Sequence, residues 1–326
     1  VANGTTKANS AILHAGYDPL PGTLMARLNV RGVALARELC QKLDVPYRAC
    51  GSFVLAFTPE ECATLDTLKA RGDTNGVPGL EILTGDQARS MDPQLSDQVQ
   101  AALYAPTAAI CSPWEYCLAL AETAVRNGAR LHLETEVTGI EKTGGGWLVH
   151  TSQGDFSARY LVNAAGVHAD AVHDMAAPHA FTIRPSRGEY YLLDKAEGSR
   201  VSHTIFQCPN RNGKGVLVSP TVHGNLIVGP NAAPVEGDDT ATTAAGLDFV
   251  RTTALKSVPS IAFGQCIRNF AGVRANTEIH DFILQEKDGF VDAAGICSPG
   301  LSAEPAIGEN LVPLLIRAGL APELRP

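Results

Sequence analysis

The segment that most constrains the fold lies near the end of the chain, where an apolar stretch, a turn of small residues and a helical pattern follow one another. Phe290 to Ala294 is an apolar stretch that ends at Gly295, which predicts a short buried strand. The following residues, 298 to 302, have turn chemistry, and apolar residues then recur at helical spacing as far as Leu315. A helix that begins there directs unpaired N–H groups and the positive end of its dipole into the turn. We therefore predict a site for an electron-rich group at this strand–turn–helix unit.

Residues 112 to 178 show alternating helix and strand patterns. Helical spacing covers 113–127 and 168–175, strands are predicted at 130–135 and 158–163, and a hairpin turns at Gly144-Gly145-Gly146. A strand that continues through such a crossover implies a parallel sheet. This part of the chain, with the helical pattern at 23–43 and the C-terminal unit, therefore predicts an α/β lobe.

Residues 180 to 290 have a different pattern of short strands separated by Gly, Pro and Asn turns, with one helix near 242–255. This composition predicts a mainly antiparallel sheet inserted into the α/β lobe. We expect the α/β lobe to comprise 1–45, 106–178 and 290–326, and the antiparallel lobe to comprise 46–105 and 179–289.

Charge and composition exclude several classes of protein. A net charge of -8 without any basic cluster argues against a nucleic-acid partner, because phosphate binding draws on grouped Lys and Arg. No apolar run reaches the roughly 20 residues of a transmembrane helix, so we expect a cytoplasmic protein, with peripheral attachment to a membrane left open. The eight cysteines are scattered without a C-x-x-C pair, which disfavours a metal site and a disulfide framework.

Six motifs, in order along the chain, resemble those of FAD-dependent oxidoreductases of the D-amino-acid oxidase superfamily. They are TTKANSAILHAG at 5–16, LVNAAG at 161–166, RGEYYL at 187–192, SPTVHGN at 219–225, FAGVR at 270–274 and SPGL at 298–301. The branch of L-2-hydroxyglutarate oxidases and glycerol-3-phosphate dehydrogenases is the most similar. The resemblance implies a Rossmann-like FAD-binding lobe and an antiparallel substrate lobe.

The sequence departs from this family in one respect. The family begins with a strand and a G-x-G-x-x-G turn that binds the pyrophosphate of the dinucleotide, and no G-x-G-x-x-G occurs in these residues. Three explanations are open: the sequence is incomplete before Val1, another segment supplies the unit, or FAD binds poorly. We favour the first, because the remaining motifs need a cofactor.

The resemblance implies a set of cofactor contacts spread over four segments. Val137 would pair its backbone with the adenine, while the small polar residues near the N-terminus and the two turns would approach phosphate or flavin. The expected contacts are Thr5, Thr6, Asn9, Ser10, Val137, Ala164, Ala165, Gly166, Gly300, Leu301 and Ser302. Each has a structural alternative: a capped loop for Asn9 and Ser10, a plain strand residue for Val137, and a tight turn for 164–166.

Candidate catalytic and substrate-binding residues lie in the same motifs. His14 and His223 are candidate proton acceptors, although His14 could be a core histidine and His223 an exposed turn residue. Arg274 lies among small and apolar residues, so it needs an anionic partner: a substrate carboxylate or phosphate, or an internal salt bridge with Glu278 or Asp281. Arg187 and Tyr190 would frame the same pocket. Glu304 is expected to face away from the flavin or to pair with a cation.

These inferences predict an enzyme that oxidises a small anionic hydroxy acid by hydride transfer to FAD. L-2-hydroxyglutarate is the first expectation, glycerol 3-phosphate the alternative, and an amino acid a third possibility. The electron acceptor, whether oxygen, a quinone or a partner protein, stays open. The competing hypothesis is a partner-dependent, non-catalytic subunit with an incomplete nucleotide lobe.

Overall fold

The computed structural model describes residues 1–209 and 215–322. Within these residues, nine strands form a large sheet that is antiparallel except where β12 runs parallel to β3. Its order is β15-β11-β14-β13-β12-β3-β5-β4, and β16 pairs with β11. The strands are β3 (Ser52–Ala56), β4 (Glu81–Thr84), β5 (Ala101–Ala105), β11 (Ile183–Leu193), β12 (Thr204–Gln207), β13 (Leu217–Pro220), β14 (Leu226–Gly229), β15 (Ala233–Pro234) and β16 (Cys266–Thr277).

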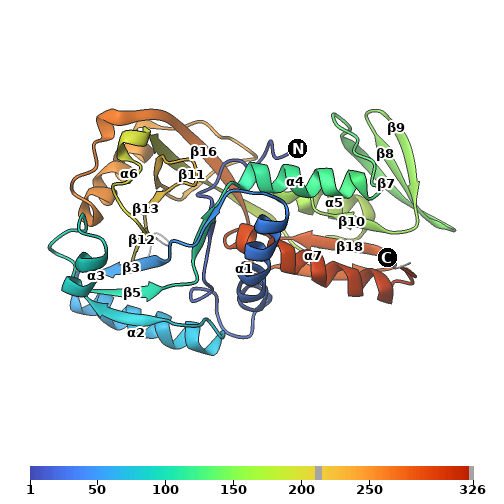
Figure 1. Ribbon diagram of the computed structural model, residues 1–326. Coiled ribbons are helices and arrows are strands. Elements are labelled where there is room, and N and C mark those ends of the chain that lie inside the picture. The colour runs from blue at the N-terminus through green and yellow to red at the C-terminus, as the bar shows by residue number, and fades with distance from the viewer. Residues whose placement is uncertain (210–214, 323–326) are drawn as a thin grey trace.

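Three helices accompany the large sheet: α2 (Pro59–Thr74), α3 (Gly85–Met91) and α6 (Ala244–Ser257). The Thr58 side chain accepts from the Glu61 N–H at the start of α2, and Glu60 and Glu61 lie in its first turn, where the helix dipole favours acidic residues. Helix α6 packs against β11 and β14. Figure 1 shows these elements on one side of the molecule.

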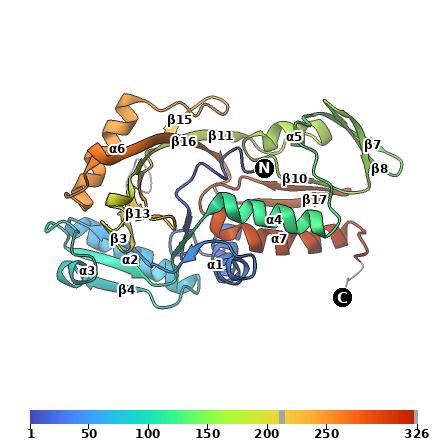
Figure 2. The ribbon, with the colours of Figure 1, turned by 45° about the horizontal axis from the view of Figure 1, so that its top comes forward.

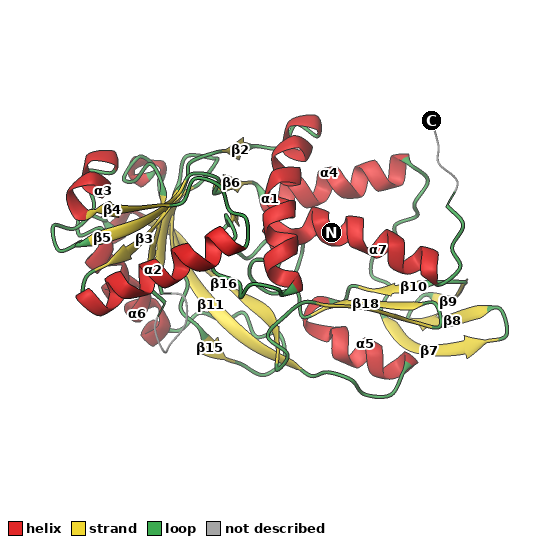
Figure 3. Cartoon of the chain, turned by 90° about the horizontal axis from the view of Figure 1, so that it is seen from below, coloured by secondary structure: helices red, strands yellow, loops and turns green. Residues whose placement is uncertain are grey.

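A small sheet carries the parallel pair that the sequence predicts. Strand β10 (Leu161–Asn163) runs parallel to β18 (Phe290–Ala294), and β17 (Ile283–Lys287) is antiparallel to β18. Helices α7 (Gly300–Arg317) and α5 (Ala169–Ala176) pack against β18 and lie on opposite faces of the sheet (Figure 3). The turns that follow β10 and β18 therefore leave the same edge of the sheet.

Helix α1 (Leu24–Lys42) lies between the two sheets (Figure 3). Thr23 caps its first turn, and the Asp281 carboxylate accepts from the N–H groups of Leu24 and Met25. A Cβ at Gly32 would lie 2.1 Å from the Ser302 carbonyl oxygen, so this glycine allows the backbones of α1 and α7 to touch. The contact brings the first turn of α7 against the middle of α1.

The remaining elements form two further small sheets and one α-helix. A small antiparallel sheet joins β1 (Ile12–Leu13), β6 (Ala109–Cys111) and β2 (Tyr47–Arg48), and α4 (Pro113–Arg126) follows β6 and lies beside α7 (Figure 2). The predicted hairpin is present as β7 (Val137–Thr143) and β8 (Gly146–Thr151), extended by β9 (Gly154–Ala158).

Two sequence-based expectations need comment. Residues 130–135 are not a strand, because they find no ladder partner among the described residues, and Leu131 and Leu133 are more than half exposed. The mixed α/β fold with its antiparallel sheet is confirmed, whereas the exact division into two lobes stays a prediction. Strand β17, assigned by that division to the antiparallel lobe, pairs with β18.

No helix within residues 1–209 and 215–322 is both long enough and apolar enough to cross a membrane. The eight cysteines, all within the described residues, form no disulfide, and Cys40, Cys111 and Cys208 are buried.

Candidate active site

His14 is held at the junction of three distant segments. Its N–H donates to Ser302 Oγ at 2.7 Å, and its carbonyl oxygen accepts from Asn29 Nδ2 of α1 at 2.5 Å. The imidazole ring lies 5.5 Å from the ring of Phe206 on β12. The backbone on both sides of the imidazole is therefore fixed by α1 and α7, which limits how far the side chain can shift.

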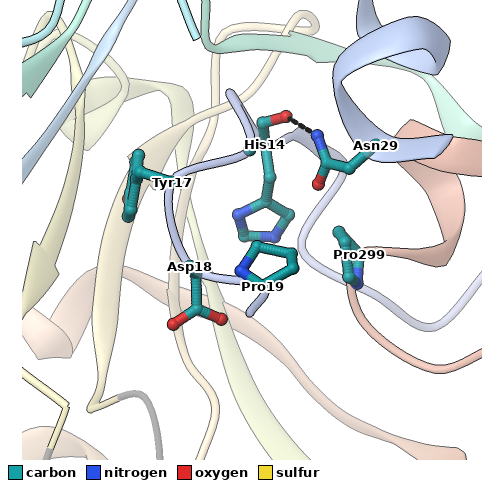
Figure 4. A pocket seen from close by; sticks show the side chains of 7 residues that line it. His14, Tyr17, Asp18, Pro19, Asn29 and Pro299 are labelled. Carbon is teal, nitrogen blue, oxygen red and sulfur yellow. Dashed lines mark hydrogen bonds between the residues drawn. The ribbon is translucent and has the colours of Figure 1, made fainter. Parts of the chain in front are cut away.

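Two adjoining pockets share His14, Tyr17 and Asp18 in their walls. One is completed by Gly16, Pro19, Asn29 and Pro299, and the other by Val54, Leu68, Phe206, Gln207 and Pro209. Figure 4 shows the His14 ring among Tyr17, Asp18, Pro19 and Pro299. Burial raises the pKa of Tyr17 far above its usual value, and the Asp18 charge adds to the rise, so this phenol keeps its proton. His14 thus lines two pockets with mixed polar and apolar walls, where the N-terminal segment meets the large sheet.

Helix α7 begins at this junction without a side-chain cap. Pro299 is the N-cap residue and has no side chain that can accept from the first-turn N–H groups. Gly300 and Leu301 are partly exposed, so solvent reaches the start of the helix, and the electron-rich group predicted there stays a prediction. Ser302, in contrast, is fully buried, and its hydroxyl binds the backbone of His14 and Ile12. The Ser302 side chain therefore connects the segment around His14 to the first turn of α7.

Glu304 follows the first turn of α7 and lies beside Tyr116 of α4. Burial raises the pKa of Glu304 to about 7, and the Tyr116 hydroxyl opposes only part of this rise. The expectation of a pairing cation is not met within the described residues, where no positive charge contributes to this shift. The carboxyl group is instead directed into the protein, because Tyr116 belongs to the core cluster around Cys40 and Cys111.

The turn after β10 contains the predicted contacts Ala164, Ala165 and Gly166. Ala164 and Gly166 are exposed, and Gly166 has φ +60°, a backbone conformation that L side chains rarely adopt. A Cβ at Gly166 would meet no atom within 4 Å, so the space beside the turn is open. This open turn lies at the carboxyl end of a parallel strand, where ligands of α/β sheets bind.

The N-terminal segment lies on the ribbon formed by β11 and β16. Thr5 Oγ1 donates to the Val273 carbonyl oxygen at 2.6 Å, and a Cβ at Gly272 would lie 1.9 Å from the Ala8 carbonyl oxygen. Asn9 shapes the loop itself, since its amide donates to Thr6 O and accepts from the Ala11 N–H. The capped-loop alternative therefore describes the Asn9 side chain, while Thr6 is exposed and Ser10 partly exposed.

Arg274 and Tyr190 share one face of the β11–β16 ribbon. The register pairs Ser186 with Arg274, Gly188 with Gly272 and Tyr190 with Phe270, so these six residues point to one side. The Tyr190 and Phe270 rings stack at 4.8 Å, and the Arg274 guanidinium extends over Gly188, where a Cβ would lie 2.6 Å from Nη2. Burial raises the pKa of Tyr190, and the adjacent Arg274 charge opposes part of the rise.

Arg274 has no carboxylate partner among residues 1–209 and 215–322. Its Nη2 donates to the Asn231 carbonyl oxygen at 3.4 Å, a long contact with a neutral acceptor. The two internal partners considered from the sequence are engaged elsewhere: Glu278 lies 3.9 Å from Arg184, and Asp281 caps α1. A partly buried guanidinium with unused donors is suited to bind an anionic ligand.

Arg187 lies on the opposite face of the same ribbon. It pairs with Val273 in the register, and its Nη1 forms an ion pair with Asp239 Oδ2 at 2.7 Å. The residue is 9% exposed, and α6 begins on this face, because Glu189 accepts from the Thr243 N–H at the start of that helix. Arg187 was expected to frame the same pocket as Arg274, but the two residues lie on opposite faces of the ribbon and are not brought into one cluster.

His223 and Val137 lie outside the two pockets around His14 and contact other parts of the chain. His223, in the turn between β13 and β14, lies 3.1 Å from Glu115 Oε1 and stacks on Trp114, both in the first turn of α4. The structure does not place it in the pockets around His14. Val137 is the first residue of β7 and pairs with Thr151 of β8.

Comparison with known proteins connects this geometry to a family. The sequence profile described as DAO, FAD dependent oxidoreductase, matches residues 1–314. The chain belongs to this family of FAD-dependent oxidoreductases. The uncapped start of α7 offers N–H donors, and the open turn after β10 allows close approach to its backbone, so these residues fit part of a bound FAD.

Relatives within this FAD-dependent family include enzymes of glycerol 3-phosphate. The chain is 48% identical over 320 residues to a glycerol 3-phosphate dehydrogenase of Caloramator mitchellensis, covering 97% of this chain and 66% of that protein. It is 32% identical to a glycerol 3-phosphate oxidase of Mycoplasma genitalium, with 95% and 84% covered. An L-2-hydroxyglutarate dehydrogenase of Indibacter alkaliphilus is 26% identical, with 94% and 88% covered.

A solved structure has the same fold. The FAD-bound, dithionite-reduced L-alpha-glycerophosphate oxidase of Mycoplasma pneumoniae superposes with a TM-score of 0.90 at 30% identity, covering 97% of this chain and 86% of that one.

Sequence reasoning missed Asn29 and Asp18. Asn29 is fully buried within α1 and binds the His14 carbonyl, and the available signal was a polar residue beside the apolar face of a helix. Asp18 lines both pockets, and nothing in its local sequence pattern distinguishes it from a turn residue.

Proposed function

We propose that the protein oxidises glycerol 3-phosphate at a carbon that bears a hydroxyl, with Arg274 binding the phosphate and His14 accepting the hydroxyl proton. The relatives named for glycerol 3-phosphate are 48% and 32% identical to this chain, against 26% for the L-2-hydroxyglutarate dehydrogenase of Indibacter. These similarities favour the alternative substrate of the sequence analysis over its first expectation.

The observation that carries the proposal is the Arg274 guanidinium, which lacks a carboxylate partner on the ribbon face within the described residues. Gly188 and Gly272 have no side chains, so the Arg274 guanidinium and the N-terminal segment can both approach the backbone of the ribbon on this face. Two N–H donors in a planar fork match two oxygens of a phosphate or a carboxylate. Arg274 thus binds and orients the anionic end of the substrate.

His14 lies further along the same N-terminal segment, six residues after the Ala8 carbonyl that rests on Gly272. An imidazole within hydrogen-bond reach of a substrate hydroxyl removes its proton as the adjacent C–H is oxidised. The fixed backbone of His14 supplies orientation, because Ser302 and Asn29 hold its N–H and carbonyl. FAD, when bound, supplies the hydride acceptor.

Anaerobic reduction of the FAD-loaded protein tests the substrate. Glycerol 3-phosphate, L-2-hydroxyglutarate and a small amino acid are added separately, and the loss of the oxidised flavin absorbance is followed. We expect glycerol 3-phosphate to reduce the flavin with at least about a tenfold higher second-order rate constant than either competitor, a difference of about 1.4 kcal/mol. A faster reaction with L-2-hydroxyglutarate would overturn the assignment.

The same experiment separates the enzyme from the partner-dependent subunit. A protein that binds FAD in a one-to-one ratio and is reduced by a hydroxy compound acts as a catalyst by itself. A protein that stays colourless after addition of FAD, or that is reduced by none of the compounds, supports the subunit hypothesis. Subsequent reoxidation by air or by a quinone analogue identifies the electron acceptor.

A further inference from the structure

A buried carboxylate lies directly beneath the open turn after β10. Asp292, on β18, is 1% exposed and accepts hydrogen bonds from three side chains that come from different elements. Asn163 Nδ2 donates to Oδ1 at 2.9 Å, while His173 Nδ1 and Gln285 Nε2 donate to Oδ2 at 2.8 and 2.9 Å. Asp292 thus joins β10, α5 and β17 around a single charge.

Asn163 transmits this connection to the turn. It pairs directly with Asp292 in the parallel ladder and is 3% exposed. Its amide nitrogen also donates to the Ala169 carbonyl oxygen at 2.8 Å, and its oxygen accepts from the Ala165 N–H at 3.2 Å. The orientation of this amide is fixed by Asp292 together with the Ala169 carbonyl, because both oxygens accept from the NH₂ end. The Asn163 side chain therefore connects the backbone of the turn, at Ala165, to the Asp292 carboxylate.

His173 fixes the other end of the same unit. Its Nδ1 lies 2.8 Å from Asp292 Oδ2 and its Nε2 lies 3.1 Å from the Pro178 carbonyl oxygen, so the ring joins α5 to β18 and to the segment after the helix. The ring is 5% exposed and lies 5.1 Å from the ring of Phe181. The strand, the turn and α5 are consequently fixed as one rigid unit.

A buried charge at this position is costly for stability alone. Apolar side chains of similar volume fill a sheet core at least as well as a buried ion pair does, and the neighbouring Val291 and Ala293 are ordinary apolar core residues. An apolar side chain at 292 could not accept from the second N–H of the Asn163 amide, so it would not connect this side chain to β18. The network is fully satisfied at its centre, and such networks rigidify the backbone that they hold.

We propose that Asp292 is a positioning residue for the flavin site: through Asn163 it holds the backbone of residues 164–166 in the conformation that receives FAD. This inference rests on the proposed contact between that turn and the cofactor. A turn that is already ordered before binding avoids the entropy loss of ordering it when FAD binds. The residue contacts no reacting atom and acts on affinity for the cofactor.

The experiment measures the dissociation constant of FAD by titrating apo-protein and following the quenching of flavin fluorescence. The test variants are Asp292→Leu, which removes every acceptor at similar size, and Asp292→Asn, which keeps one oxygen for Asn163. The matched controls are Asp92→Leu and Asp92→Asn. Asp92 is also buried, at 2% exposed, and also pairs with a histidine, His203, at 3.0 Å, but it lies beside the large sheet.

We expect Asp292→Leu to weaken FAD binding by about tenfold or more, the factor that corresponds to loss of a hydrogen bond to a charged group. Asp292→Asn should recover most of the affinity, to within about threefold of the unaltered protein. The Asp92 variants should lower the unfolding temperature without changing FAD affinity. An unchanged affinity in Asp292→Leu, or an equal loss in Asp92→Leu, would overturn the proposal.

Two further variants keep the test decisive. If Asp292→Leu does not fold, Asn163→Ala removes the connection to Ala165 and must itself weaken FAD binding about tenfold, and an unchanged affinity overturns the inference. Gly166→Val tests the cofactor contact directly, because a β-branched residue strains a backbone at φ +60°. Unchanged FAD affinity in Gly166→Val would refute the contact itself. Weaker binding there, with no effect in Asp292→Leu and Asn163→Ala, would refute the positioning role alone.

Discussion

The N–H of His14 donates to the hydroxyl oxygen of Ser302 across 2.7 Å and so joins residues that are 288 positions apart in the chain. Ser302 is fully buried in the first turn of α7 and also contacts the Ile12 carbonyl oxygen at 3.5 Å. The contact places the proposed proton acceptor beside the helix start that is suited to an electron-rich group. A residue near each end of the chain is therefore needed to form one site.

Replacing His14 with Gln should lower the rate of anaerobic flavin reduction by about 100-fold to 10,000-fold, because the general base is lost. FAD affinity should stay within about twofold, since the backbone contacts to Ser302 and Asn29 remain. His223→Gln is the comparison variant. It removes the contact with Glu115 and Trp114 and should reduce the rate by less than about tenfold. A larger effect at His223 than at His14 would show that His223, and not His14, accepts the substrate proton.

Replacing Arg274 with Ala should raise the KM for glycerol 3-phosphate by about 100-fold, from the loss of charge-assisted hydrogen bonds worth about 3 kcal/mol. FAD affinity should change far less. The matched control is Arg184→Ala on β11, an exposed arginine 3.9 Å from Glu278, which should leave both values unaltered. Equal losses of substrate and flavin binding in Arg274→Ala would show a structural role.

Gly188→Ala tests the position of the Arg274 guanidinium over the ribbon without replacing a charged residue. The new Cβ would lie 2.6 Å from Arg274 Nη2 and 2.8 Å from Pro230 Cβ, so the guanidinium must move. We expect KM for the anionic substrate to rise about tenfold, a cost of about 1.4 kcal/mol. Gly264→Ala serves as the control, because its Cβ would meet nothing within 4 Å. Matching KM values in the two variants would contradict the proposed position of Arg274.

Glu304→Gln should change how stability depends on pH. The folded-state pKa of about 7 lies above the ordinary value of 4.5, because burial disfavours the charged form. Between these values the unfolded state binds fewer protons than the folded state, so the unfolding free energy of the unaltered protein falls as pH rises. Gln has no such titration, and above pH 7 the variant should be more stable, by up to about 3 kcal/mol.

Urea unfolding at pH 5 and at pH 8 measures this difference. The control is Glu309→Gln on the exposed side of α7, where the carboxylate pairs with Arg31 at 2.8 Å in full contact with solvent, so its loss should change stability little at either pH. A Glu304→Gln variant with the same loss of stability between the two pH values as the unaltered protein would refute the titration.

The sequence predicted the elements whose signals are local. The helix at 24–42 carries its own cap at Thr23, and the glycines at 144–146 turn the hairpin between β7 and β8. The strand at 290–294 and the helix from Gly300 were recognised because small residues separate them. The prediction of a strand at 130–135 was wrong. Alternating apolar residues form a strand only when a neighbouring strand supplies hydrogen bonds.

The types of residue in the candidate site could be predicted from the sequence, but the contacts between these residues could not. An arginine among small residues indicates an anion site, but only the register shows that Arg187 and Arg274 face opposite sides of the ribbon. Glu304 was expected to face away or to pair with a cation, and its burial beside Tyr116 depends on how α4 packs against α7. Asp292 was read as part of an apolar strand, because the three donors that satisfy its charge come from distant parts of the sequence.

Stopped-flow reduction of the FAD-loaded protein by glycerol 3-phosphate and by glycerol, in the unaltered chain and in Arg274→Met, tests the central claim most directly. The two compounds differ in the phosphate alone, and the two proteins differ in the guanidinium. We predict that the unaltered protein prefers glycerol 3-phosphate, and that Arg274→Met loses about 100-fold of that preference, because phosphate and guanidinium contribute through one interaction. An unchanged preference in Arg274→Met would contradict the account.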